Sequence, residues 1–159
     1  MRPRRADNFG TYFVTTKAAE GRMLLQSERC AKLLIDVLYH YRGEERFLVH
    51  DFVVMPNHLH AIVTPAETIE RTMQLIKGGF SYRAKHEIGI QWEIWQRGYT
   101  DHRIRDWNDF ARHREYLRMN PVRAHLCERA EQFPFSSAVG SFNLDPVPQR
   151  LKPLIEASD

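Results

Sequence analysis

Few cysteines and no long apolar segment restrict the classes of protein to which this chain can belong. The two cysteines, Cys30 and Cys127, are far apart among 159 residues, which argues against a disulfide framework and against a zinc site of clustered thiolates. The first five residues, MRPRR, are basic and polar, and no apolar run is long enough for a signal peptide or a membrane span. We therefore expect a protein of a reducing, cytoplasmic compartment with no membrane partner.

Internal repeats, low-complexity tracts and long linkers are also absent. A chain of 159 residues suits one domain whose core needs neither disulfides nor structural metals. The formal net charge of +3 permits binding to nucleic acid without requiring it. Three prolines follow Gly140, which is typical of a segment with little regular structure. We expect a domain over residues 1–139 and a C-terminal tail over residues 140–159.

Two histidines on a short apolar strand are the first candidate functional residues. Residues 55–63, MPNHLHAIV, follow a run of β-branched and aromatic residues at 47–54, and residues 55–57 form the turn of a predicted antiparallel hairpin. Side chains alternate along a strand, so His58 and His60 share one face and can chelate one ion. Ordinary strand histidines explain the pair as well, and a metal site needs a further ligand from elsewhere in the chain.

Hydrophobic periodicity predicts the other elements. Thr68 is the expected N-cap of a second helix, and Pro121 disfavours helical geometry in the residue before it, so a third helix should end at Asn120. Further strands are predicted at residues 10–16 and 91–96. Helices are predicted at residues 27–41, from residue 69 onward and at residues 106–120, with one more short helix after Arg123.

Two adjacent glycines, Gly78 and Gly79, stand inside the second predicted helix. Together they cost a helix about 2 kcal/mol relative to alanine, so the missing side chains should have a use. Either the helix breaks there, or another backbone or a phosphate chain approaches closely. The sequence leaves both alternatives open.

The third predicted helix places polar side chains along one flank of its buried stripe. On a wheel of about 100° per residue, the flank lies beside the apolar face. If it faces His58 and His60, the site gains an amide ligand and a hydroxyl nucleophile. The stripe consists of Trp107, Phe110, Ala111 and Leu117, and the flank of His113, Tyr116 and Asn120.

Each flank residue also has an ordinary explanation. Asn120 precedes a proline, where an amide side chain commonly takes part in capping and turn geometry. Tyr116 suits a half-buried aromatic residue with its hydroxyl in water. His113 suits a helix salt bridge with Asp109, four residues earlier.

Three ordered motifs resemble the REP-associated tyrosine transposases, which are single-tyrosine relatives of insertion-sequence transposases with a His-hydrophobic-His motif. The motifs are MPNHLH at residues 55–60, WQRGYTDHRIRD at residues 95–106 and YLRMNPVRA at residues 116–124. The resemblance extends from about Gly10 to Ser137. One departure is His125, which stands where relatives often have glycine.

The resemblance implies an α+β, ferredoxin-like fold with an antiparallel sheet of four to five strands and helices mainly on one face. It makes His58 and His60 metal ligands, Asn120 the third ligand and Tyr116 the nucleophile, with Tyr99 as a rival nucleophile. The implied cofactor is a divalent metal ion, Mg²⁺ or Mn²⁺. Attack by the tyrosine would leave a 5′-phosphotyrosine link and a free 3′-hydroxyl.

The predicted function is therefore a metal-dependent endonuclease and strand transferase that acts on REP-type single-stranded or hairpin DNA, with a monomer favoured over a homodimer. A DNA hairpin-binding protein without catalysis is the main alternative, and a zinc-stabilised structural domain is a third. Basic side chains near the motifs are candidate phosphate contacts. They are Arg71, Lys77, Arg83, Arg103, Arg105 and Arg123.

Overall fold

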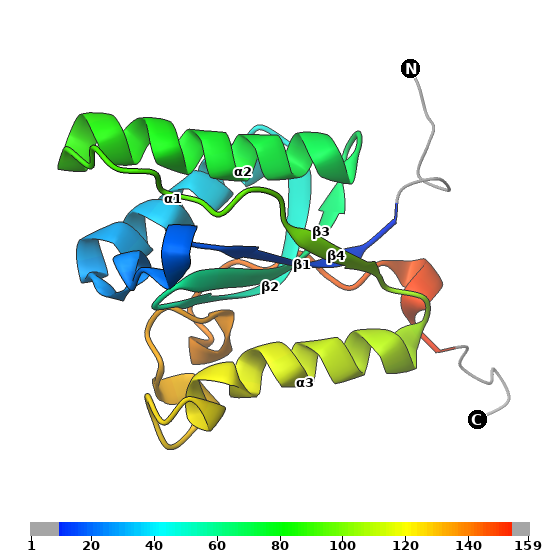
Figure 1. The fold of residues 1–159 in the computed structure, drawn as a ribbon. Coiled ribbons are helices and arrows are strands. Elements are labelled where there is room, and N and C mark those ends of the chain that lie inside the picture. The colour runs from blue at the N-terminus through cyan, green and yellow to red at the C-terminus, as the bar shows by residue number, and fades with distance from the viewer. Residues whose placement is uncertain (1–9, 154–159) are drawn as a thin grey trace, which may run out of the picture.

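The sheet is the centre of the molecule, which a computed structural model describes over residues 10–153 (Figure 1). Its four antiparallel strands lie in the order β2-β3-β1-β4. This order, with one helix between β1 and β2 and another between β3 and β4, is the ferredoxin-like arrangement and confirms the predicted α+β class. The strands are β1 (Tyr12–Lys17), β2 (Phe47–Met55), β3 (His58–Pro65) and β4 (Thr100–Arg103).

Helices cover both faces of this sheet. Figure 1 shows α1 (Glu28–Gly43) and α2 (Ile69–Arg83) on one face and α3 (Trp107–Arg123) on the other. Side-chain caps start all three helices: Ser27, Thr68 and Asp106 each accept a hydrogen bond from the backbone amide three residues later. Short turns connect these elements: a π-helical turn at Ala84–Ile88 and 3₁₀ turns at Ala19–Gly21, Leu24–Gln26, Ala130–Gln132, Ser137–Val139 and Gln149–Leu151.

Two apolar layers hold the helices to the sheet. Leu59, Ala61 and Val63 of β3 belong to the layer under α1 and α2, whereas Ile62 packs with Phe110 and other residues in the layer under α3. Because side chains alternate along a strand, His58 and His60 lie on the α3 face. The metal site predicted for this pair would therefore lie on the face of the sheet that α3 covers.

The glycine pair lies within an unbroken α2. A Cβ on Gly79 would stand 2.9 Å from the Tyr41 ring and 3.1 Å from Val37 of α1, whereas a Cβ on Gly78 would meet open space. Close approach of α1 side chains, rather than a helix break, explains Gly79. Nothing in the structure explains Gly78.

One predicted strand and one predicted helix end are wrong. Residues 91–96 form no strand, and among them Trp95 alone makes a bridge, to Ala18. Instead of strand pairing, tertiary contacts hold Trp95: its ring is buried and its indole nitrogen donates to the Lys77 carbonyl. The third helix does not stop before Pro121 but continues to Arg123, with the proline ring buried in its last turn. In place of the short helix predicted after Arg123, the segment before Phe133 contains a 3₁₀ turn at Ala130–Gln132.

Residues 140–153 have little regular structure, as expected, but they pack against the domain. Asp145 forms an ion pair with Arg42 of α1 and accepts a hydrogen bond from the Val49 amide. Leu151 is buried in the layer under α3, and Arg150 donates to the Thr11 hydroxyl. The boundary at residue 139 remains a prediction, and these contacts weigh against it. Over the described residues, no helix combines the length and the apolar character needed to cross a bilayer.

Candidate active site

Strand pairing on both sides fixes the two histidines. β3 is an inner strand, and His58 lies opposite Lys17 of β1 while His60 lies opposite Thr15. On the other side, β2 pairs with the same residues of β3. Neither histidine can shift along its strand without breaking hydrogen bonds to both neighbours, so the pair is held at a fixed spacing.

Each imidazole is also oriented by a hydrogen bond at Nδ1. His58 Nδ1 donates to Asn57 Oδ1 at 2.7 Å, and His60 Nδ1 lies 2.8 Å from the Thr15 hydroxyl. Because Nδ1 of His58 donates to an amide oxygen, its Nε2 atom carries the lone pair. Outer hydrogen bonds of this kind fix the orientation of histidines that bind metals.

A buried carboxylate docks α3 on the sheet. Asp51 of β2 is fully buried and forms ion pairs with Arg114 at 3.1 Å and Arg118 at 2.9 Å. The Ser137 hydroxyl donates a hydrogen bond to the same carboxylate. Because the two arginines lie on either side of Tyr116 in the sequence, this network sets the position of the helix turn that carries the tyrosine.

The four predicted site side chains converge between α3 and the sheet. The ring centroids of His58 and His60 are 4.6 Å apart, and those of His60 and Tyr116 are 5.7 Å apart. The Asn120 side chain lies within hydrogen-bonding reach of His58. A pocket of about 440 Å³ opens beside Tyr116, which is 47% exposed. The proximity predicted from the sequence is present, while the individual roles remain predictions.

Burial keeps both histidines neutral. Burial lowers the pKa of His60 to about 3, and the positive charges of nearby groups, including Arg123 and Lys17, act in the same direction. Burial likewise lowers the pKa of His58, against the opposing effect of Asn120. Neutral imidazole is the form that coordinates metal ions, so protons compete little with a metal at neutral pH.

Arg123 lies directly over the nucleophile candidate. Its guanidinium carbon is 4.4 Å from the centroid of the Tyr116 ring, and it donates a hydrogen bond to the Tyr116 carbonyl. The guanidinium is attracted by the face of the ring, so this contact and the hydrogen bond hold the tyrosine and Arg123 together. Arg123 was predicted to contact phosphate, and this position beside Tyr116 permits both roles.

A second cluster lies at the start of α3. Among residues 10–153, one group of three His and Asp side chains has all its ligand atoms within 4.8 Å: His102, Asp109 and His113. Although burial opposes its charged form, hydrogen bonds from the Arg105 amide and from His102 hold the pKa of Asp109 well below its usual range. Arg112 lies 3.3 Å from the same carboxylate. The predicted His113–Asp109 pair is confirmed at 3.2 Å.

The predicted phosphate contacts are dispersed. Arg71, Lys77 and Arg83 belong to α2, on the face opposite His58 and His60. Lys77 donates to the carbonyls of Gln96 and Gly98, and Arg83 pairs with Glu87. Two of the six lie on the α3 side of the sheet: Arg105 bound to Asp109, and Arg123 over Tyr116. Arg103 lies over the Tyr12 ring, which packs in the layer under α1 and α2. None of the six is tested as a DNA contact.

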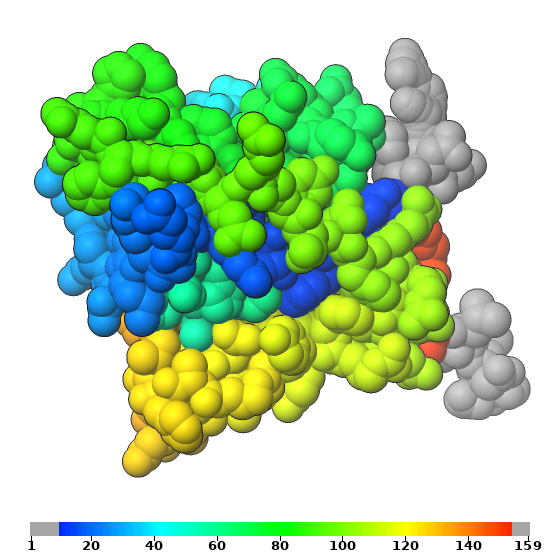
Figure 2. Space-filling view, viewed as in Figure 1, coloured from blue at the N-terminus to red at the C-terminus, as the bar shows by residue number. Residues whose placement is uncertain are grey.

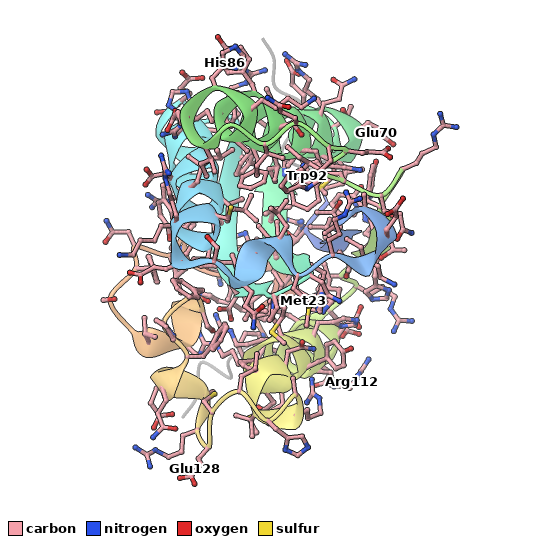
Figure 3. The ribbon with its side chains drawn as sticks, turned by 60° about the vertical axis from the view of Figure 1, so that its left-hand side comes forward. Met23, Glu70, His86, Trp92, Arg112 and Glu128 are labelled. Atoms are coloured by element: carbon pink, nitrogen blue, oxygen red, sulfur yellow. The ribbon has the colours of Figure 1, made fainter. Side chains whose placement is uncertain are left out.

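Several residues of the site have no signal in the sequence. Phe13 stacks on His60 with ring centroids 5.1 Å apart, and it also contacts His113 and Tyr116. Arg112 lines the pocket beside Tyr116 and projects from the outer side of α3 (Figure 3). The alternation of β1 would have placed Phe13 and Thr15 on one face, but only the strand order shows that this face adjoins His60.

Comparisons with known proteins agree with this geometry. The family model described as "Transposase IS200 like" matches residues 12–120, which is more than two thirds of the chain. A REP-associated tyrosine transposase of Escherichia coli K12 is 28% identical over 131 residues, covering 80% of this chain and 76% of the relative. A putative REP-associated tyrosine transposase of Haemophilus influenzae is 24% identical over 147 residues, covering 80% of this chain and 79% of that protein.

Solved structures carry the same fold. One, of a REP-associated tyrosine transposase bound to a REP hairpin, is 25% identical and superimposes with a TM-score of 0.64 over 98% of this chain and all of that chain. A putative transposase from Deinococcus radiodurans, 17% identical, covers 74% of this chain and 95% of its own with a TM-score of 0.55, which supports the fold alone. The family match, the extent of these relatives and the convergence of Tyr116 with the histidine pair lead to one conclusion: the chain belongs to the IS200-like transposases, as a tyrosine transposase.

Proposed function

We propose that this transposase nicks single-stranded DNA at REP-type hairpins and rejoins it through a covalent bond to Tyr116. The observation that carries the proposal is the convergence of Tyr116 from α3 with His60 from β3, at 5.7 Å between ring centroids. The hairpin substrate is inferred from the relative whose solved structure contains a REP hairpin. Binding without catalysis would not need a tyrosine and two oriented histidines around one pocket.

The chemistry proceeds by exchange of phosphodiester bonds. The Tyr116 hydroxyl attacks phosphorus, a bond forms between the phenol oxygen and phosphorus, and the bond from phosphorus to the 3′-oxygen breaks. The phenol proton goes to solvent or to a base, and the departing 3′-oxygen takes up a proton. The energy of the broken bond is retained in the 5′-phosphotyrosine link, so a 3′-hydroxyl can reverse the step and join the strand elsewhere.

His58, His60 and Asn120 are the residues that we propose to hold a divalent metal ion, Mg²⁺ or Mn²⁺. Their fit rests on two imidazoles kept neutral by burial, each with Nδ1 engaged by a neighbouring side chain, and on the Asn120 side chain beside His58. When bound, the ion supplies a positive charge that polarises a non-bridging phosphate oxygen. The imidazoles and the amide would place that charge on the side of the sheet that faces Tyr116, where it would orient the phosphate for in-line attack.

The cluster of His102, Asp109 and His113 is the rival metal site. Asp109 already binds two guanidinium groups, at 3.2 Å to Arg105 and 3.3 Å to Arg112, and a metal ion would have to displace or repel them. Titration of Mn²⁺ into the protein separates the two sites. We expect His60→Gln to abolish binding and His102→Gln to retain it; the reverse result would move the metal to the Asp109 cluster.

The decisive experiment is an adduct assay on single-stranded REP hairpins with Mg²⁺ or Mn²⁺. Wild-type protein should form a metal-dependent covalent adduct, and Tyr116→Phe should form none because only the attacking oxygen is lost. Tyr82→Phe is the matched control, since Tyr82 is also exposed but lies on α2 across the sheet. Hairpin binding without an adduct would favour the binding-protein alternative. An adduct that survives in Tyr116→Phe would implicate Tyr99.

A further inference from the structure

A second hollow continues the active-site pocket along β1. The pocket beside Tyr116 is lined in part by Thr15, and the same residue lines a neighbouring hollow of about 220 Å³. Lys17 and residues 96–100 form the rest of that hollow. In Figure 2, dark-blue atoms of β1 are exposed between α3 and the light-green segment that precedes β4, so the path lies open at the surface.

The hollow exists because β1 loses its partner over a few residues. Pairing with β4 ends where Thr15 meets Thr100, and contact with the same segment resumes where the Gln96 amide donates to the Lys17 carbonyl. Residues 97–99 bow away between these points, helped by Gly98, whose φ of +79° suits glycine. The result is a recess at the sheet edge, directly beside the metal-ligand face.

Lys77 holds the wall of this recess in place. Its ammonium group reaches from α2 and donates to the carbonyls of Gln96 at 3.2 Å and Gly98 at 2.5 Å. The recess is therefore already formed before a ligand binds. A preformed site loses less entropy on binding.

The recess carries two cations, Lys17 and Arg97, that form no ion pair within residues 10–153. Its lining contains no Asp or Glu. By contrast, Arg112 in the adjoining pocket is bound to Asp109. Lys17 lies opposite His58, on the face where the scissile phosphate would sit. Unpaired cations beside an aromatic ring, here Tyr99, suit a nucleotide of single-stranded DNA.

We propose that this recess binds the nucleotide on the leaving side of the scissile phosphate, with Lys17 contacting its phosphate and Tyr99 stacking on its base. The proposal rests on the proposed function. In an in-line displacement the nucleophile and the leaving oxygen stand on opposite sides of phosphorus. Tyr116 occupies one end of the path, so the strand that departs with a 3′-hydroxyl extends past Thr15 into the recess.

The test uses binding, so that it does not depend on catalysis. In a Tyr116→Phe background, the affinity for a single-stranded REP hairpin with 5′ and 3′ flanks is measured over a range of salt concentrations. Adding Lys17→Gln should weaken binding several-fold and reduce the slope of log K against log salt by about 0.7, the loss of one contact to a single strand. Lys85→Gln, an exposed cation outside the path, should leave both unchanged.

Position along the strand is tested with neutral methylphosphonate linkages placed one at a time. One linkage on the 5′ side of the cleavage junction should weaken binding when Lys17 is present and have no effect in Lys17→Gln. For protein with Tyr99 or with Tyr99→Phe, DNA with an abasic nucleotide at the same position should bind more weakly than intact DNA. For Tyr99→Leu, which has no ring to stack, intact and abasic DNA should bind equally.

Two results would overturn the proposal: a salt slope unchanged by Lys17→Gln, or a Lys17-dependent linkage on the 3′ side of the junction. The junction is located by the adduct of the wild-type protein. If no adduct forms while one linkage still depends on Lys17, the recess is confirmed as a strand-binding site and the catalytic proposal alone fails.

Discussion

His60 is the residue whose protonation the fold controls most strongly within the site. The ring is 6% exposed, and its burial beside His58, Arg123 and Lys17 lowers its pKa to about 3. An unfolded histidine titrates near 6.5. Between pH 6.5 and pH 3, His60 is protonated in the unfolded chain but not in the folded chain. Protonation therefore favours the unfolded chain, and the free energy of unfolding decreases as the pH falls through this range.

We therefore predict that the metal-free protein loses stability on acidification from pH 7 to pH 5. His60 alone should contribute on the order of 2 kcal/mol to that loss in the free energy of unfolding. The measurement is urea unfolding at a series of pH values. His60→Gln should flatten the pH dependence, whereas His86→Gln, at an exposed histidine, should not. Equal pH dependence in wild type and His60→Gln would contradict the prediction.

His125 shows how a departure from relatives is accommodated. The residue follows α3 with φ of +62°, in the left-handed region, and its side chain is exposed. The resemblance indicated glycine at this position, and the backbone gives the reason, because a Cβ is disfavoured there.

Replacing this histidine should stabilise the protein. His125→Gly removes the Cβ from a left-handed position and is expected to raise the free energy of unfolding by about 0.5–1 kcal/mol, measured by urea unfolding. Ala124→Gly is the matched control, since Ala124 has φ of −87° and should lose stability instead. A loss of stability in His125→Gly would mean that the imidazole makes a contact worth more than the backbone strain.

At the scale of elements, the packing of α1 on α2 distinguishes the two adjacent glycines. Gly78→Ala places a methyl group in open space and should raise the free energy of unfolding by about 1 kcal/mol through helix propensity. Gly79→Ala gains the same propensity but forces Tyr41 or Val37 to move. Thermal or urea unfolding should place Gly79→Ala at least about 1 kcal/mol below Gly78→Ala. Equal stability of the two variants would show that Tyr41 and Val37 of α1 move aside at no cost in free energy.

The sequence predicted the elements that depend on local pattern. The β2–β3 hairpin, α1, α2 and the start of α3 follow from alternation, period and caps, and all were found. The segment 91–96 was misassigned because its conformation depends on distant partners: Trp95 is held by Ala18 and by the Lys77 carbonyl. The end of α3 was misplaced because burial of the proline ring outweighs the local preference against it.

The site was predictable only in part. Spacing put His58 and His60 on one face, and the family resemblance supplied Tyr116 and Asn120. The buried Asp51, which anchors α3, carries no signal in a one-dimensional pattern, because its arginine partners lie more than 60 residues away in sequence. The recess at Lys17 could not be predicted from the sequence either, since it arises from a gap in pairing between strands far apart in the chain.

At the scale of the whole molecule, one chain supplies every residue of the proposed site. α3 is docked on its own sheet through Asp51, Arg114 and Arg118, and Tyr116 meets His60 of the same chain. The predicted monomer stays a prediction.

We predict that two inactive variants cannot restore each other. A mixture of Tyr116→Phe and His60→Gln should form no adduct, because each chain lacks one of the two groups and neither helix crosses to the other molecule. The assay is the same hairpin adduct assay, with a mixture of wild type and either variant as the control. Light scattering should give a monomer mass. Adduct formation in the mixed sample would show that the tyrosine helix acts on a partner's sheet.

The open position of the nucleophile also determines which DNA molecules can be substrates. Tyr116 stands at the surface, 47% exposed, over a groove along β1 that no segment of residues 10–153 covers. A strand can enter this groove sideways, at any point of its length, and needs no free end to thread through the protein. If the proposed function holds, we expect circular DNA and single strands exposed transiently inside a long duplex to be as accessible as a short oligonucleotide.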